Sequence, residues 1–434
     1  MAHGSGRLPW DLIASNLEWR LGSSDACKCK RTRLHSRMRS TQSEDMTAFA
    51  KAFAKAIDED AIRERVKYPQ YEAPHPEDII MAESLATRIE HEAVEWLVGD
   101  QRQPLRRRYA QEMRKASAFL ILPGSNGCYD FDQVNGKGFT ALEALKLLII
   151  HNEMEPVLRV CAHKDIALFG WKDVRPCSCV MGSDSGWDKL YETVLRVYLV
   201  LNVAYCFPLT WDPMAGKTPE NDYRHSSSYQ IALRWSCTRP LMSPVMSNLF
   251  QKFYGISNHH FSGILGEIWV DDPERWRGKL EMTDDGEMER FPYGLLPFED
   301  FITLEERFLP YMPNEVDCRK VGSMLCHFLP PELALQTMEL ADYKGERVLP
   351  IPHDPLHPLN KKVLVDQLDH LWQIMVCCQM VVKEIGSKTR NTRGYKPLAW
   401  EKEVSDTLEG FWGSRNCEDG EDDEDDEDEE NSED

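Results

Sequence analysis

Histidines are the residues in this chain that could perform acid–base or metal chemistry, because imidazole titrates near neutral pH and binds metals. His353 and His357 stand four residues apart with Asp354 between them, but prolines bound their loop and exclude a helix there. The two-histidine zinc arrangement of a helix face is therefore excluded, and a rigid turn that caps the following helix is favoured. His259 and His260 have no partner that the sequence identifies. An enzyme whose site is assembled from these four distant histidines stays an alternative.

The tripeptide Gly216-Lys217-Thr218 resembles the end of a phosphate-binding loop. That loop requires a glycine five residues before its last one and a helix that begins at the threonine. This chain has Trp211 at the first position, and Pro219 follows the threonine directly. A surface turn is the predicted structure.

The 13 cysteines are scattered along the chain, without the dense pairing of a small secreted domain. Cys177 and Cys179 enclose a single residue, whereas paired zinc ligands usually enclose two or more, so reduced thiols are expected. No motif defines a catalytic residue, a cofactor site or a metal site, and none is predicted. The chain has no signal-peptide core, no apolar run long enough to span a membrane and no Asn-x-Ser/Thr acceptor. The cytoplasm, the nucleus or both are the expected location.

Charge separates the end of the chain from its body. The net charge is −21, and the residues from Glu418 to Asp434 hold 14 acidic and no basic side chains, which leaves −21 + 14 = −7 upstream. Such a segment cannot bury enough apolar area to offset its ordering entropy, so a disordered tail is predicted. The tail could bind basic proteins or only keep the chain soluble. The acidic body gives no reason to expect a nucleic acid or an anionic membrane as a partner.

Hydrophobic periodicity predicts a mainly α protein, with an irregular multi-helix body and few short strands. Phe49, Phe53, Ile57 and Ala61 recur every four residues, and the apolar seam Leu364–Ile385 has the 4-3-4-3 spacing of one long helix. The seam is wider than a coiled-coil stripe, which favours core packing and a monomer. For Trp187–Leu201, helix and buried strand both stay open. Further helices are predicted at 76–99, from Thr140, and at 244–255, 330–342 and 400–412, with a short strand at 268–270.

The predicted organisation begins with a flexible leader, in which the basic run Lys28–Arg33 could serve as a nuclear import signal. Met46 opens the first well-patterned helix, so the preceding residues could be an extension or an artefact of the gene model. The predicted regions are a basic leader (1–45), a helical region (46–205), a loop- and proline-rich region (206–313), a C-terminal helical region (314–412) and a disordered acidic tail (413–434).

The run Leu329-Pro330-Pro331-Glu332-Leu333, continuing to Leu340, resembles the opening helix of an F-box. In that family this helix docks on the adaptor subunit of a cullin ubiquitin ligase. The second half of the motif is absent here, where a proline loop and a long helix follow. The block Leu329–Ile385 is also similar to C-terminal regions of uncharacterised filamentous-fungal proteins. We therefore predict a non-enzymatic interaction protein, with a degenerate F-box-like adaptor as its most specific version. The candidate partner-binding residues are Leu329, Pro330, Glu332, Leu333 and Met338.

Overall fold

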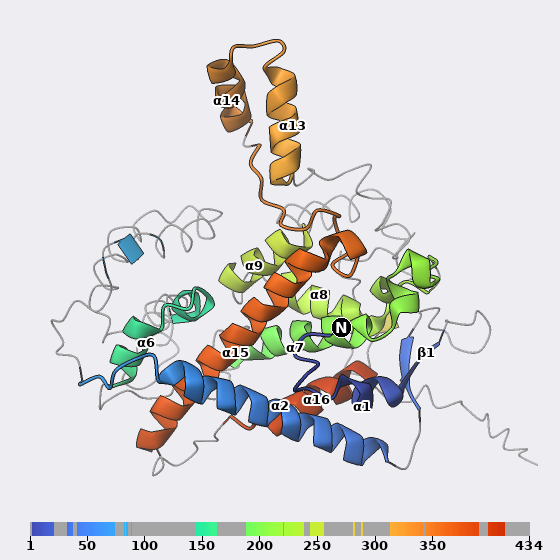
Figure 1. The fold of residues 1–434 in the computed structure, drawn as a ribbon, viewed down its shortest axis with the longest axis vertical. Coiled ribbons are helices and arrows are strands. Elements are labelled where there is room, and N and C mark those ends of the chain that lie inside the picture. The colour runs from blue at the N-terminus through green and yellow to red at the C-terminus, as the bar shows by residue number, and fades with distance from the viewer. Residues whose placement is uncertain are drawn as a thin grey trace, which may run out of the picture.

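In a computed structural model, the described residues form a mainly helical body from which one helical hairpin projects (Figure 1). This agrees with the fold class that periodicity predicts. The structure describes residues 2–20, 33–37, 41–73, 82, 84–85, 88, 145–162, 188–219, 221–237, 244–255, 281–282, 288–289, 313–341, 343–389 and 398–412.

The elements are mostly helices, joined by short 3₁₀ turns. Strands occur only as two antiparallel pairs among these residues, β1 (Leu17–Arg20) with β2 (Arg33–Ser36) and β3 (Glu281–Met282) with β4 (Met288–Glu289). The helices are α1 (Trp10–Ser15), α2 (Gln42–Arg65), α6 (Met154–Cys161), α7 (Asp188–Tyr205), α8 (Ser227–Cys237), α9 (Pro244–Tyr254), α13 (Glu315–Leu325), α14 (Pro331–Leu340), α15 (Lys361–Thr389) and α16 (Trp400–Trp412). The 3₁₀ turns are η3 (Pro208–Thr210), η4 (Pro213–Ala215), η5 (Tyr223–His225) and η6 (Pro358–Asn360).

The core lies where α2, α7, α15 and α16 meet. The predicted stripe of α2, from Phe49 to Ala61, is completely buried against α15 and α16. Helix α7 carries buried apolar side chains on nearly all sides, as expected for a helix enclosed by others. Its helical state decides the question that β-branched and aromatic residues left open in the sequence.

Helix α15 packs inside the body, as its broad apolar surface predicts. The seam residues Leu364, Leu371, Cys378 and Val382 are all buried, in contact with α2, α6 and α7. The predicted helices at 244–255, 330–342 and 400–412 correspond to α9, α14 and α16. No helix among the described residues is long and apolar enough to cross a membrane.

The first residues of the chain differ from the flexible leader that composition predicts. Leu8, Trp10, Ile13 and Leu17 are all buried in the common core. Helix α2 also begins at Gln42, before Met46. The described part of 1–45 is therefore part of the fold, because its few apolar residues fill gaps between helices far along the sequence.

Several predictions fall on residues outside the described ranges. These are residues 28–32 of the basic run Lys28–Arg33, most of the helix at 76–99, Thr140, the Cys177–Cys179 pair, His259 and His260, the strand at 268–270 and the acidic tail 413–434.

Candidate functional site

The Gly216-Lys217-Thr218 turn closes the short helix η4. Gly216 adopts φ = +105°, a conformation that glycine reaches without the cost that a Cβ atom imposes. Asn221 fixes the turn, because its side-chain amide donates to the Gly216 carbonyl at 3.0 Å and its Oδ1 accepts from the Thr218 N–H at 2.6 Å. A turn is present as predicted, but its lysine side chain is only 13% exposed. Lys217 therefore points into the protein.

The proline loop 350–358 forms a rigid turn before α15. Asn360 is fully buried and holds the loop, because its Nδ2 donates to the carbonyls of Ile351 and Asp354 while its Oδ1 accepts from the Ile351 N–H. The His357 ring accepts from the Leu359 N–H and so caps η6. His353 is buried with φ = +56°, a left-handed conformation that is uncommon outside glycine. The predicted turn is thus present, and it caps η6, the 3₁₀ turn that precedes α15.

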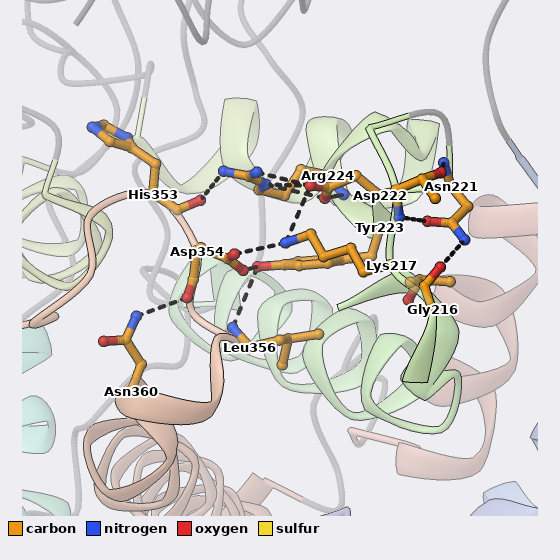
Figure 2. Close-up of polar contacts among 12 residues, drawn as sticks. Gly216, Lys217, Asn221, Asp222, Tyr223, Arg224, His353, Asp354, Leu356 and Asn360 are labelled. Atoms are coloured by element: carbon orange, nitrogen blue, oxygen red, sulfur yellow. Dashed lines mark hydrogen bonds and ion pairs between the residues drawn. The ribbon is translucent and has the colours of Figure 1, made fainter. Parts of the chain in front are cut away.

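These two segments meet in a buried cluster of charged residues (Figure 2). The Lys217 ammonium lies 2.7 Å from Oδ2 of Asp354 and 3.2 Å from Oδ2 of Asp222. The Tyr223 hydroxyl donates to Oδ1 of Asp354 at 2.7 Å and accepts from the Leu356 N–H at 3.3 Å. Contacts between residues more than 130 positions apart thereby join the proline loop to the η4–η5 segment.

Arg224 completes the cluster from the far side of Asp222. Its Nε and Nη2 atoms bind both oxygens of the Asp222 carboxylate at 2.7 to 3.2 Å, and its Nη1 donates to the His353 carbonyl at 3.3 Å. Burial alone would raise the pKa of Asp222, but the hydrogen bonds and charges of Arg224 and Lys217 outweigh it and lower that pKa. Burial and the nearby Asp354 carboxylate raise the pKa of Tyr223 well above 10.0. The tyrosine is therefore a neutral hydrogen-bond donor.

The charged side chains of this cluster form ion pairs with one another. Two cations, Lys217 and Arg224, face two carboxylates, Asp222 and Asp354, so the formal charges cancel. Each of the four charged side chains is 16% exposed or less, which makes their mutual bonds strong and the loss of one partner costly. Among the described residues, no group of three or more histidine, cysteine or acidic side chains could hold a metal ion. We assign this cluster to the cohesion of two loops.

The second candidate site is the hairpin of α13 and α14, which extends from the top of the body in Figure 1. Asn314 and Asp317 form a capping box at the start of α13, each side chain accepting from the other's backbone N–H. The buried Arg347 guanidinium binds Asp317 at 2.8 Å. Ala334 is buried, and a Cβ atom on Gly322 would lie 3.3 Å from Sδ of Met338, so the two helices pack closely.

All five candidate partner-binding residues lie on or beside α14 in this hairpin. Pro330 and Glu332 are exposed, and Leu333 is 48% exposed, whereas Leu329 and Met338 are half-buried. The hairpin also exposes Met324, Phe328, Leu335 and Leu340, which the sequence analysis does not single out as partner-binding. Their exposure depends on how the helices project from the body, and local sequence does not report this.

The family model for Gramillins biosynthetic cluster protein GRA5 matches residues 11–418, which include the charged cluster and the hairpin. The chain belongs to this family. The match supports the similarity to fungal proteins that the block Leu329–Ile385 indicates, and it adds no F-box assignment. No curated protein and no solved structure matches the chain.

Of the four histidines pooled as an enzyme site, the described residues include two, His353 and His357. His357 caps a turn, and His353 contributes its carbonyl oxygen to the cluster. The residues that do converge are Lys217, Asp222 and Asp354. Sequence analysis notes the first and third, but no local pattern indicates that they touch.

Proposed function

We propose that this chain is a non-enzymatic interaction protein that binds a protein partner on the α13–α14 hairpin. One observation carries the proposal. Of the 13 large hydrophobic side chains exposed in the described part of the chain, seven lie between Val316 and Val348. Single exposed hydrophobic residues are ordinary, whereas a concentration of them marks a contact surface.

The distribution of apolar residues around α14 supports this proposal. Ala334 and Met338 lie on the side that faces α13. Leu333 and Leu340 are seven residues apart, so they share a second side, and Leu335 projects from a third. A helix that is apolar on several sides is typical of buried surroundings. A protein partner that covers Leu333 and Leu340 would bury this exposed side of α14.

The partner that the F-box-like opening favours is the adaptor subunit of a cullin ubiquitin ligase. In the F-box family, the leucines at this helix start contact the adaptor, and Leu329 and Leu333 occupy those positions here. The hairpin partner of α14 is the preceding helix α13, whereas F-box helices follow the opening one, so an adaptor complex would use a reduced motif. The family description names GRA5 as a biosynthetic cluster protein, and we extend that setting to this chain.

Purified full-length chain and purified adaptor, mixed and measured by isothermal titration calorimetry, test the adaptor proposal. We expect binding by the natural chain and at least a tenfold weaker affinity for Leu329→Ser/Leu333→Ser, since a central interface residue contributes about 2 kcal/mol or more. Leu209→Ser/Leu359→Ser is the matched control, because it replaces two exposed leucines outside the hairpin. Undiminished binding by the hairpin variant, or no binding by the natural chain, overturns the adaptor proposal.

An enzyme assembled from distant residues is the second hypothesis, and one observation favours it. The amine of Lys217 and the hydroxyl of Tyr223 both lie within hydrogen-bond distance of the Asp354 carboxylate. A substrate would have to displace Lys217 or Tyr223 from Asp354 to reach these groups. Structural pairing explains the same contacts without a substrate, so we rank the interaction function first.

A further inference from the structure

The side chain of His3 is inserted between α7 and α15, and each of its polar atoms has a partner. Its backbone N–H donates to Oδ1 of Asn202 at 2.6 Å, and its carbonyl accepts from Nε1 of Trp10 at 2.8 Å. The ring nitrogens Nδ1 and Nε2 lie 2.6 Å from the Tyr198 hydroxyl and 2.6 Å from Oδ1 of Asp369, respectively. His3 is thus held like a bound ligand by groups from several elements.

Two of the residues that receive His3 lie deep in an apolar core, whereas the side chain of the third, Asp369, is 63% exposed. Tyr198 and Asn202 are 0% exposed and one helical turn apart on α7. The Asn202 Nδ2 donates to the Tyr198 carbonyl, so its Oδ1 is left to accept from His3. The donor to Asn202 is the backbone N–H of residue 3, whereas the His3 ring itself bonds to the Tyr198 hydroxyl. A buried hydroxyl without a hydrogen bond costs free energy, so Tyr198 favours an occupant. Burial raises the pKa of Tyr198 well above 10.0 and keeps its hydroxyl protonated.

The geometry also restricts the chemistry of the occupant. An ionised carboxylate only accepts hydrogen bonds, so Asp369 requires a ring N–H, while the Tyr198 hydroxyl can donate to an unprotonated ring nitrogen. The ring meets Tyr198 edge-on with centroids 5.5 Å apart, and Trp372 lies 6.2 Å away. A flat ring with a donor and an acceptor nitrogen on separate edges meets these requirements.

We infer that Tyr198, Asp369 and the neighbouring aromatic rings form a binding site for planar nitrogen heterocycles of the imidazole class, and that the His3 ring is its built-in occupant. Tyr198 and Asp369 lie within the family match, which begins at Asp11, whereas His3 precedes it. The site therefore belongs to the matched part of the chain and its occupant does not.

The test replaces His3 with alanine in the full-length chain and adds free imidazole. We expect His3→Ala to melt below the natural chain and to recover part of the difference as imidazole saturates the vacated site. We expect 1-methylimidazole to restore less, because it has no ring N–H for Asp369. The natural chain, whose site is filled, and His327→Ala, which removes an exposed ring, should show no such rise.

Two results overturn the inference. One is a melting temperature of His3→Ala that responds to imidazole no more than that of the natural chain. The other applies if His3→Ala does not fold by itself. Its refolding from urea is then followed by near-ultraviolet circular dichroism with and without imidazole, and a failure of imidazole to restore the folded signal rejects the site.

Discussion

Asp222 is the residue that both cations of the buried cluster share. Its carboxylate is 4% exposed, binds the Arg224 guanidinium at 2.7 Å and lies 3.2 Å from the Lys217 ammonium. Burial raises the pKa of Asp222, but the hydrogen bonds and charges of the two cations lower it by more, so this pKa lies below its ordinary value of 3.8 in the folded protein. The carboxylate therefore stays ionised at a lower pH than it does in the unfolded chain. A lowered carboxyl pKa stabilises the fold above the unfolded value, and that stability is lost as pH falls through the folded value.

We predict that Asp222→Asn destabilises the protein by about 3 kcal/mol near neutral pH, because it leaves buried cations without their carboxylate. Asparagine can still cap η5, so the loss reports charge pairing. The variant should also lose less stability than the natural chain as pH falls below 3.8, the ordinary pKa of the carboxyl group, since the contribution of Asp222 is already absent. Urea unfolding from neutral to acid pH measures both effects. The control is Glu59→Gln, on an exposed ion pair with Lys55, and equal losses for both variants would contradict the prediction.

The sequence marks the residues of this cluster without indicating their contact. Lys217 attracts attention as part of an incomplete phosphate loop, and Asp354 as a neighbour of two histidines. They are 137 positions apart, and periodicity reports only which face of an element is buried. The same limit applies to His3, whose partners Tyr198 and Asp369 lie far along the chain.

Among the elements, the α13–α14 hairpin combines a firm base with an exposed outer surface. Its base is fixed by the Asp317–Arg347 ion pair and by the Pro313 carbonyl, which accepts from two backbone N–H groups at 3.1 Å. A Cβ atom on Gly345 would lie 3.0 Å from the Glu315 nitrogen, so a larger residue would require the backbone at the base of the hairpin to shift by a few tenths of an ångström. The hairpin is therefore held at its base by contacts that do not involve its exposed leucines.

Replacing exposed leucines of α14 should leave the stability of the fold intact. For Leu333→Ser/Leu340→Ser we expect a free energy of unfolding within about 0.5 kcal/mol of the natural value per site, as is usual for surface substitutions. Leu371→Ser is the comparison, because that side chain is fully buried in α15 and its loss should cost several kcal/mol. Chemical denaturation measures both. A large loss for the hairpin variant would mean that another part of the same chain covers these leucines, and would count against a docking surface.

Element-scale predictions succeed where a pattern is long and local. The stripes of α2 and α15 extend over several turns, so each helix and its buried face are recognisable without tertiary information. The segment 8–17 is different, since its buried residues Leu8, Trp10, Ile13 and Leu17 extend over too few turns to distinguish them from an isolated apolar patch. Composition alone therefore predicts a flexible leader there, although tertiary packing buries the segment.

For the whole molecule, charge is the property that the structure of the body does not explain. The 14 acidic side chains of 418–434 account for two-thirds of the net charge of −21, and the family match ends at Glu418. In the buried cluster, the charges of two cations and two carboxylates cancel, so the cluster adds nothing to the net charge. Because the tail carries −14 and the rest of the chain only −7, we expect a basic partner to be attracted mainly by the tail.

We predict that deleting 418–434 leaves the melting temperature unchanged and removes binding to a purified histone, used as a basic-protein probe. Binding is lost because the remaining chain carries a charge of only −7. Salt ions screen the attraction of the tail, which extends only about 10 Å at 0.1 M salt. Binding by the intact chain should accordingly weaken steeply as salt is added. A control chain keeps the length of the tail but replaces its Asp and Glu with Asn and Gln, which separates charge from bulk. If the neutral tail binds as well as the acidic one, or if deletion only lowers solubility, the tail serves the solubility of the chain and not the capture of basic proteins.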